Sequence, residues 1–331
     1  MDLDEARLLK NQLGGYAAEL LAARPRAAAA TPSATGVALG LAPRGDGQFD
    51  VAVRYRLGTP TARMVARRLQ AEAGPVVDVR RTGRVRPLAL AGPRPPVVTA
   101  QAAGETGRVR PLRPGVSIAH HAVSAGTLGG FVTLDGSPVV HALSNYHVLV
   151  GSPDAQRGDA VLQPGPADGG RLPADRVGEL AAFVPLAPGR TALVDAALAR
   201  LDDGVAVDAT YPVGELAGTA PAQGADEVAK VGRTTGVTSG RVTAIELDGV
   251  VVGYGEELGE LAFDNQIEVE GAAAAPFSRG GDSGSVVYRP ADRTAIGLLF
   301  AGSESGGENG LGLTYLNPIV EVLTALGATL V

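Results

Sequence analysis

A serine, a histidine and an aspartate stand in local contexts that suit hydrolytic chemistry. Ser283 lies in the glycine turn "SRGGDSGSVVY" (residues 278–288), which leads directly into a β-prone run. A serine hydroxyl is a weak nucleophile, and it needs a neighbouring base, usually a histidine that a carboxylate orients. Glycine turns that contain serine are also common structural features, so the turn alone leaves both interpretations open.

The histidines narrow the choice of base. The sequence has four of them, at positions 120, 121, 141 and 147, and all precede Ser283. This order excludes an α/β-hydrolase, in which the histidine follows the serine, and Ser285 stands where the G-x-S-x-G motif needs a glycine. His147, in "HALSNYHVLVG", follows an alternating apolar strand, where an imidazole can face a cleft. His141 lies inside that strand and is expected to pack there or to lie at its edge.

The carboxylate that best suits His147 is Asp195, in the apolar run "TALVDAALARL". A buried aspartate is costly unless it is paired or hydrogen-bonded. Asp195 is therefore expected to accept a hydrogen bond from Nδ1–H of His147 and to stabilise the imidazolium. The alternative is an edge position that points to water, as expected for the loop acids at 202, 203 and 208.

The spacing of apolar residues predicts four regions. Residues 1–32 read as an amphipathic N-terminal helix and a linker, residues 33–82 as a small ββαβ domain, and residues 83–115 as a connector rich in Pro, Gly and Arg. Residues 116–331 contain short Val/Leu/Ala/Thr runs separated by Gly, Pro and Asp, which is typical of an all-β barrel or sandwich. The last segment, "NPIVEVLTALGA", has the start and stop signals of a helix.

The connector contains a repeat. The sequence "TGRVRPL" occurs at residues 82–88 and again at residues 106–112. One repetition is too little for a solenoid, so it predicts two equivalent extended segments that lie on the domains they join. An arginine-rich exposed connector could alternatively be a cleavage site.

The order His147, Asp195, Ser283, together with the β-rich pattern, favours the chymotrypsin architecture over subtilisin, whose order is Asp, His, Ser. Residues 125–331 resemble the trypsin-like serine peptidases: "SNYHV", "VDAALARL" and "GGDSGS" are similar to the motifs around their catalytic histidine, aspartate and serine. More narrowly, "RPLRPGVSI", "GTLGGFV" and "KVGRTTGVTSGRVTAI" resemble the cysteine-free bacterial branch and the related plant narrow-leaf-type proteins. The resemblance implies a mainly β fold, a chymotrypsin-like double β-barrel with a C-terminal helix, here preceded by the N-terminal helix and the ββαβ domain.

The resemblance also implies an activity and a site. The chain is expected to be a serine endopeptidase that forms an acyl-enzyme, with backbone N–H groups of Gly281 and Ser283 holding the oxyanion. The implied specificity pocket is formed by Phe277, Phe300, Ala301 and Gly302. Because position 277 is not an aspartate, an apolar or small residue is expected before the cut, and Asp282 is expected to be structural.

Two departures from the family bear on this interpretation. Ser285 replaces the usual last glycine of the nucleophile loop, and no freshly cleaved N-terminus of the kind that activates secreted members is evident. The competing interpretation is a catalytically silent trypsin-like scaffold that acts as a protein-binding module.

Composition limits cofactors and location. The chain has no cysteine, which excludes disulfides, thiol nucleophiles and cysteine-ligated zinc. Adjacent histidines on a strand, such as His120 and His121, point to opposite faces and make poor joint ligands, so neither a metal nor a cofactor is expected. The acidic start of the chain lacks the features of a secretory signal, and no apolar run approaches the roughly 18 residues of a membrane span, which predicts a cytoplasmic protein.

The charge is unevenly distributed. Residues 1–115 carry 18 Lys and Arg against 9 Asp and Glu, although the whole chain has 29 against 35. The two halves could dock on one another, or the basic half could contact nucleic acid. Nucleic acid is not favoured, because the arginines are dispersed and lack interleaved aromatics. The expected partners are a protein or peptide substrate and a regulatory partner of the N-terminal domain.

Overall fold

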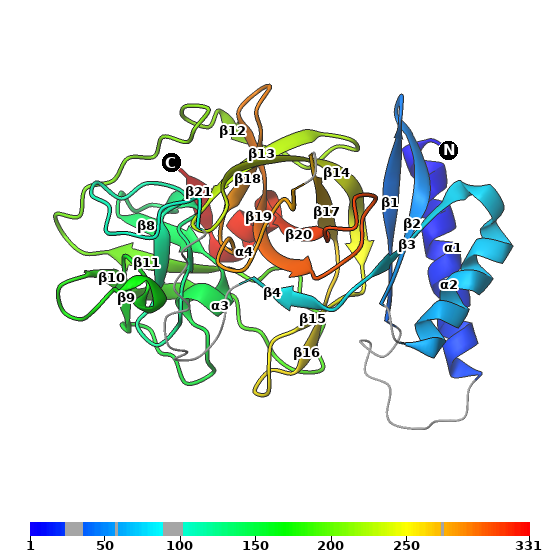
Figure 1. Ribbon diagram of the computed structural model, residues 1–331, viewed down its shortest axis with the longest axis horizontal. Helices are drawn as coiled ribbons and strands as arrows, with labels where there is room; N and C mark the ends of the chain where they lie inside the picture. The colour runs from blue at the N-terminus through cyan, green and yellow to red at the C-terminus, as the bar shows by residue number, and fades with distance from the viewer. Residues whose placement is uncertain (24–35, 57–58, 89–101, 273–274) are drawn as a thin grey trace.

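The computed structural model describes residues 1–23, 36–56, 59–88, 102–272 and 275–331 (Figure 1). The predicted linker "AAAATPSAT" lies outside these residues. The described chain is mainly β, with two large sheets, one hairpin and a few helices.

One large sheet contains a closed six-stranded barrel. The strands follow the order β13, β18, β19, β20, β17, β14, and β13 pairs with β14 to close the ring. Their bounds are β13 Glu227–Gly232, β14 Gly236–Asp248, β17 Gln266–Gly271, β18 Val286–Arg289, β19 Thr294–Ser303 and β20 Thr314–Pro318. β13 and β14 form a hairpin, with Gly232 opposite Gly236. The interior strand β19, "TAIGLLFAGS", is buried over eight of its ten residues, as expected for an apolar run inside a barrel.

The second sheet has eight strands in the order β21, β7, β8, β11, β10, β9, β5, β6. Their bounds are β5 Ser117–His120, β6 Gly126–Thr127, β7 Gly130–Leu134, β8 Val140–Ser144, β9 Ala160–Leu162, β10 Arg176–Phe183, β11 Ala197–Leu201 and β21 Ala328–Leu330. The helix α4 (Ile319–Leu326) ends at Gly327, whose φ of 59° suits a glycine cap, and β21 then returns to β7.

Shorter elements complete this part of the chain. They are α3 (Tyr146–Leu149), η3 (Pro166–Asp168), β12 (Gly218–Thr219) and the hairpin β15 (Val250–Gly253) with β16 (Glu260–Phe263). The predicted fold class, a chymotrypsin-like double β-barrel with a C-terminal helix, is confirmed. None of the helices in the described ranges combines the length and the apolar character needed to cross a membrane.

The N-terminal region consists of two helices on a short sheet. Its elements are α1 (Leu3–Ala22), β1 (Val37–Gly45), β2 (Gln48–Arg56), α2 (Pro60–Ala73), η2 (Gly74–Val76) and β3 (Val77–Thr82). α1 begins with a capping box, in which Asp2 and Glu5 each accept the other's backbone amide. β1 and β2 are antiparallel, and α2 connects β2 to the parallel β3.

This small sheet is not separate from the barrel. β1 pairs antiparallel with β14, so β1, β2 and β3 extend the barrel sheet, which reaches eleven strands with β12 and β4 (Val85–Pro87) included. In Figure 1 the N-terminal strands stand beside the barrel, with α1 and α2 on their outer face. The sequence pattern predicts the order of these elements but not this shared sheet, and the predicted domain boundaries stay predictions.

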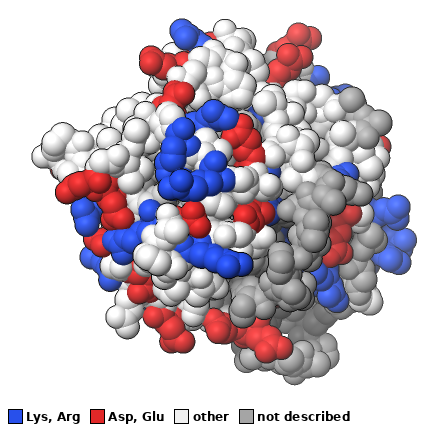
Figure 2. All heavy atoms as spheres, turned by 60° about the vertical axis from the view of Figure 1, so that its left-hand side comes forward, with Lys and Arg blue, Asp and Glu red and all other residues white. Residues whose placement is uncertain are grey.

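Ion pairs join the basic N-terminal part to the acidic remainder of the chain. They include Arg7–Glu246, Lys10–Asp248, Arg54–Glu268, Arg56–Glu260 and Arg80–Glu270. The structure therefore supports the docking explanation of the uneven charge. On the face shown in Figure 2, basic and acidic side chains also lie next to one another.

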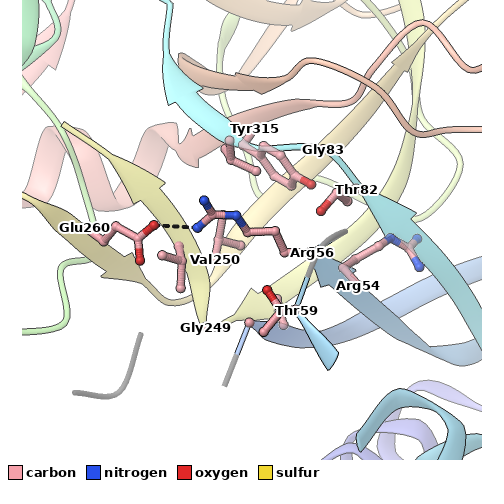
Figure 3. Close-up of a pocket in the computed structure, with 13 residues that line it drawn as sticks. Arg54, Arg56, Thr59, Thr82, Gly83, Gly249, Val250, Glu260 and Tyr315 are labelled. Carbon is pink, nitrogen blue, oxygen red and sulfur yellow. Dashed lines mark hydrogen bonds and ion pairs between the residues drawn. The ribbon is translucent and has the colours of Figure 1, made fainter. Parts of the chain in front are cut away.

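A cavity of about 210 Å³ lies where the N-terminal part meets the barrel. Figure 3 shows Arg56 reaching toward Glu260 in this cavity, near Tyr315 of β20. Thr82, Gly83 and Val85 also line it, so the cavity adjoins the chain that leads into β4. None of His147, Asp195 and Ser283 lines it.

Candidate active site

His147 and Asp195 form a buried pair on the eight-stranded sheet. His147 lies on α3, the short turn after β8, and is 6% exposed, while Asp195 is fully buried two residues before β11. Nδ1 of His147 lies 2.5 Å from Oδ2 of Asp195, and the backbone amide of His147 donates to Oδ1. Asp195 thus precedes its strand rather than lying inside it, and its carboxylate is paired as expected for a buried acid.

Two asparagines fix the backbone on both sides of this carboxylate. The amide of Asp195 donates to Oδ1 of Asn317 over 2.9 Å, and the carbonyl of Asp195 accepts from Nδ2 of Asn145 over 2.7 Å. Asn145 immediately precedes α3, and Asn317 belongs to β20 of the barrel. The position of Asp195 is therefore set by both sheets.

Tyr254 is a third partner of Asp195, and sequence reasoning missed it. It follows β15, and its hydroxyl donates to Oδ2 of Asp195 over 2.5 Å. Burial and the Asp195 carboxylate raise the pKa of Tyr254 well above its usual value, so the phenol stays neutral and donates. Its ring also packs edge-on against that of His147. No local motif marks Tyr254, because its 59-residue separation from Asp195 is closed only by the fold.

The loop that carries Ser283 needs its glycines. Gly281 and Gly284 have φ values of 100° and 97°, which L side chains rarely adopt. A Cβ at Gly284 would collide with the hydroxyl of Ser144 and the carbonyl of Thr127. The amide of Thr127 donates to the carbonyl of Ser283 over 2.7 Å. These contacts place Ser283 against the end of β8, from which His147 follows, so the predicted residues gather where the two sheets meet.

The carboxylate of Asp282 holds the loop that carries Ser283. It accepts hydrogen bonds from the amides of Thr234, Thr235 and Arg279 and lies 3.5 Å from Nζ of Lys230. Burial lowers the pKa of Lys230, against the opposing effect of Asp282. Asp282 is fully buried, and these contacts fit the structural role expected for it.

The hydroxyl of Ser283 is engaged by the chain's own connector. It donates to the carbonyl of Phe300 over 3.0 Å and accepts from the amide of Leu88 over 3.0 Å. Nε2 of His147 is buried and has no hydrogen-bond partner among the described residues. The expected hydrogen bond from Ser283 to His147 is thus not made in this arrangement. Gly281, one of the two expected oxyanion donors, donates its amide to the carbonyl of Leu88.

The residues of the expected specificity pocket surround Leu88. Phe277 is buried in a cluster against which Leu88 packs, and Phe300 accepts from the Leu88 amide. Ala301 and Gly302 lie opposite Pro87 and Arg86 in the pairing of β4 with β19. Sequence reasoning named the residues of this region, but gave no sign that residue 88 would occupy it.

The other histidines lie away from this site. His120 lies 3.2 Å from Asp159, and its ring is 4.2 Å from that of His121. His141 is buried in β8, with Nδ1 3.0 Å from the carbonyl of Val139. Within the described ranges, no group of three His, Asp or Glu side chains is placed to hold a metal ion.

Comparisons with known proteins place serine proteases among the similar solved structures. No protein-family model and no curated protein sequence matches the chain. Thermobifida fusca protease A is 18% identical, with a TM-score of 0.45, over 66% of this chain and 99% of that one. Cellulomonas bogoriensis chymotrypsin is 21% identical, with a TM-score of 0.44 and the same coverage. A glutamic acid-specific serine protease is 26% identical, with a TM-score of 0.45, over 66% of this chain and 100% of that one.

Proposed function

We propose that the chain is a serine endopeptidase in which His147, Asp195 and Ser283 form the catalytic triad. The observation that carries the proposal is a peptide carbonyl, that of Leu88, held by the Gly281 amide beside the Ser283 hydroxyl. His147 follows β8, whose last residue, Ser144, has its hydroxyl against Gly284 next to Ser283, and His147 pairs with the buried Asp195. A base, its orienting carboxylate, a nucleophile and an oxyanion donor are the parts that acyl transfer needs.

The proposed reaction has two steps. Ser283 gives its proton to Nε2 of His147 and attacks the carbonyl carbon of the substrate, and Gly281 stabilises the oxyanion. The peptide C–N bond breaks as His147 returns the proton to the leaving amine. Water then hydrolyses the acyl-enzyme by the same base, which releases a carboxylate and restores Ser283. Asp195 stabilises the imidazolium through the bond to Nδ1.

A fluorophosphonate probe tests this proposal. Because Leu88 contacts both Ser283 and Gly281, wild type is expected to react slowly, and Leu88→Gly, which removes the leucine side chain, is expected to react faster. The label should be found on Ser283 by peptide mass spectrometry, and Ser283→Ala should carry none. Ser137→Ala, at a half-buried turn serine, is the matched control and should label as wild type does. Absence of label in both wild type and Leu88→Gly would overturn the proposal and favour the protein-binding scaffold.

Tyr254 is proposed to position Asp195. A hydrogen bond to a charged group contributes about 1.5–3 kcal/mol, so Tyr254→Phe is expected to lower kcat at least about tenfold. KM should change less than twofold, because the Tyr254 hydroxyl contacts Asp195 and not the segment Val85–Leu88 that lies on Ser283. Steady-state kinetics with a fluorogenic peptide measure kcat and KM separately. Tyr55→Phe on β2 is the matched control. A rise in KM with unchanged kcat would contradict this role.

A further inference from the structure

The segment β4 lies along the barrel as an added strand. It pairs antiparallel with β19: Val85 lies opposite Ser303, Arg86 opposite Gly302 and Pro87 opposite Ala301. In this part of β19 the strand β18 has ended, since β18 pairs only as far as Leu298. Figure 1 shows β4 crossing in front of the barrel, below β20. Addition of an extended segment to an open sheet edge is one of the ways in which proteins hold a peptide.

The added strand ends at the nucleophile. The amide of Leu88 is shared between the carbonyl of Phe300, at 3.3 Å, and Oγ of Ser283, at 3.0 Å. The carbonyl of Leu88 accepts the amide of Gly281. Among the carbonyl groups of Val85–Leu88, it is therefore the carbonyl of Leu88 that lies at the proposed oxyanion donor.

The side chain of Leu88 fits an apolar recess of limited size. Leu88 is half-buried and packs on the cluster that contains Phe277. A Cβ added at Gly302 would come within 3.1 Å of Cδ1 and 3.2 Å of Cδ2 of Leu88. Gly302 thus leaves the room that the leucine occupies, and a larger residue there would exclude it.

We propose that Val85–Leu88 is the chain's own substrate and that Ser283 cleaves the peptide bond on the carboxyl side of Leu88. The inference rests on the proposed peptidase function and names its preferred residue, a leucine. Rotation of the Ser283 side chain moves its hydroxyl from the Phe300 carbonyl to Nε2 of His147, which lacks a partner among the described residues. Attack on the Leu88 carbonyl carbon gives a Leu88–Ser283 ester and a new amino terminus that takes the proton from His147. One water then hydrolyses the ester to the Leu88 carboxylate.

The two products are expected to stay together. β1 remains paired with β14, and Arg54 on β2 remains bound to Glu268 on β17. Each of these contacts joins a residue that precedes Leu88 to a residue of the barrel. None of them depends on the cleaved bond. The cleaved protein is therefore a non-covalent complex of residues 1–88 and 89–331.

The sequence repeat supplies an internal control. Leu112 ends the second copy of "TGRVRPL", but it is fully buried and its amide donates to the carbonyl of Ala206. The two copies share seven residues and differ in where the fold places them. If placement in the cleft decides cleavage, the chain is cut after Leu88 and not after Leu112.

Intact mass spectrometry of the purified full chain tests the inference. Wild type is expected to yield fragments 1–88 and 89–331 at a first-order rate that does not change on dilution, and Ser283→Ala should stay whole. Gly302→Val and Leu88→Lys should each slow cleavage at least tenfold. The matched control Gly107→Ala, at a connector glycine with open space around it, should cleave as wild type does. Cleavage after Leu112, or cleavage of wild type that Gly302→Val leaves unchanged, would overturn the inference.

A second measurement separates this inference from the proposed function. The fluorophosphonate probe and a fluorogenic peptide ending in Val-Arg-Pro-Leu are applied to Leu88→Lys, whose own segment no longer fits the recess. Labelling of Ser283 and release of the fluorophore, with no cut after Leu88 in wild type, would contradict self-cleavage and still support the peptidase function. Failure of both labelling and peptide cleavage would remove the peptidase proposal itself.

Discussion

Replacement of Asp195 by asparagine is expected to lower kcat for peptide cleavage about 10⁴-fold, the loss that follows when a triad histidine is held in the wrong tautomer. Oδ2 of Asp195 lies 2.5 Å from Nδ1 of His147 and also accepts the Tyr254 hydroxyl. Oδ1 accepts the backbone amide of His147, so an asparagine that keeps its oxygen at this position has its nitrogen at the Oδ2 position, where it donates to Nδ1. The proton of the ring would then sit on Nε2, which could no longer accept the Ser283 proton.

This variant is expected to fold normally. The backbone bonds of residue 195 to Asn317 and Asn145 do not involve the carboxylate, and asparagine fills the same volume. Circular dichroism should therefore match wild type. Asp202→Asn, at a partly exposed acid that pairs with Arg176, is the matched control and should retain full activity. A fall of less than tenfold for Asp195→Asn would contradict the assigned role.

The residues of the candidate site were predictable because each has a local signature. Gly281 and Gly284 mark a loop that only glycine can form at those φ values, and Asp195 is an acid inside an apolar run. The order along the chain then selected the architecture. Such features depend on a few neighbouring residues, which a sequence displays directly.

Contacts between distant segments were not predictable in this way. Tyr254 reaches Asp195 from a hairpin whose residues, in "VVVGYGEELGELAF", carry no motif that marks a partner. The pairing of β1 with β14 joins two strand edges, and neither edge carries a residue that specifies its partner. The repeat hinted at two equivalent extended segments, but only the fold brings Leu88 to Ser283 and leaves Leu112 in the core.

The ion pair between Arg54 and Glu268 is expected to dominate the docking of the N-terminal part. Nε of Arg54 lies 2.9 Å from both carboxylate oxygens, and the two side chains are 2% and 0% exposed. Burial lowers the pKa of Arg54, but Glu268 and Asp78 outweigh it and hold the pKa above its usual value. Without Glu268 the buried Arg54 keeps only its pair with the less buried Asp78, and removing one partner of a buried ion pair costs about 3–5 kcal/mol. Glu268→Ala is therefore expected to lower the free energy of unfolding by this amount.

Urea denaturation followed by circular dichroism measures the effect, and Glu308→Ala is the matched control. Glu308 pairs with Arg80 and Arg241 but is 62% exposed, so its loss should cost less than about 1 kcal/mol. The double replacement Arg54→Met with Glu268→Leu should recover most of the stability, because it removes both charges and fills the space. Equal destabilisation by Glu268→Ala and Glu308→Ala would contradict this account. β3 leads through residues 83 and 84 into β4. Glu268→Ala, which weakens the contact between the N-terminal part and the barrel, should therefore also slow cleavage after Leu88. The double variant without these two charges should cleave at the wild-type rate.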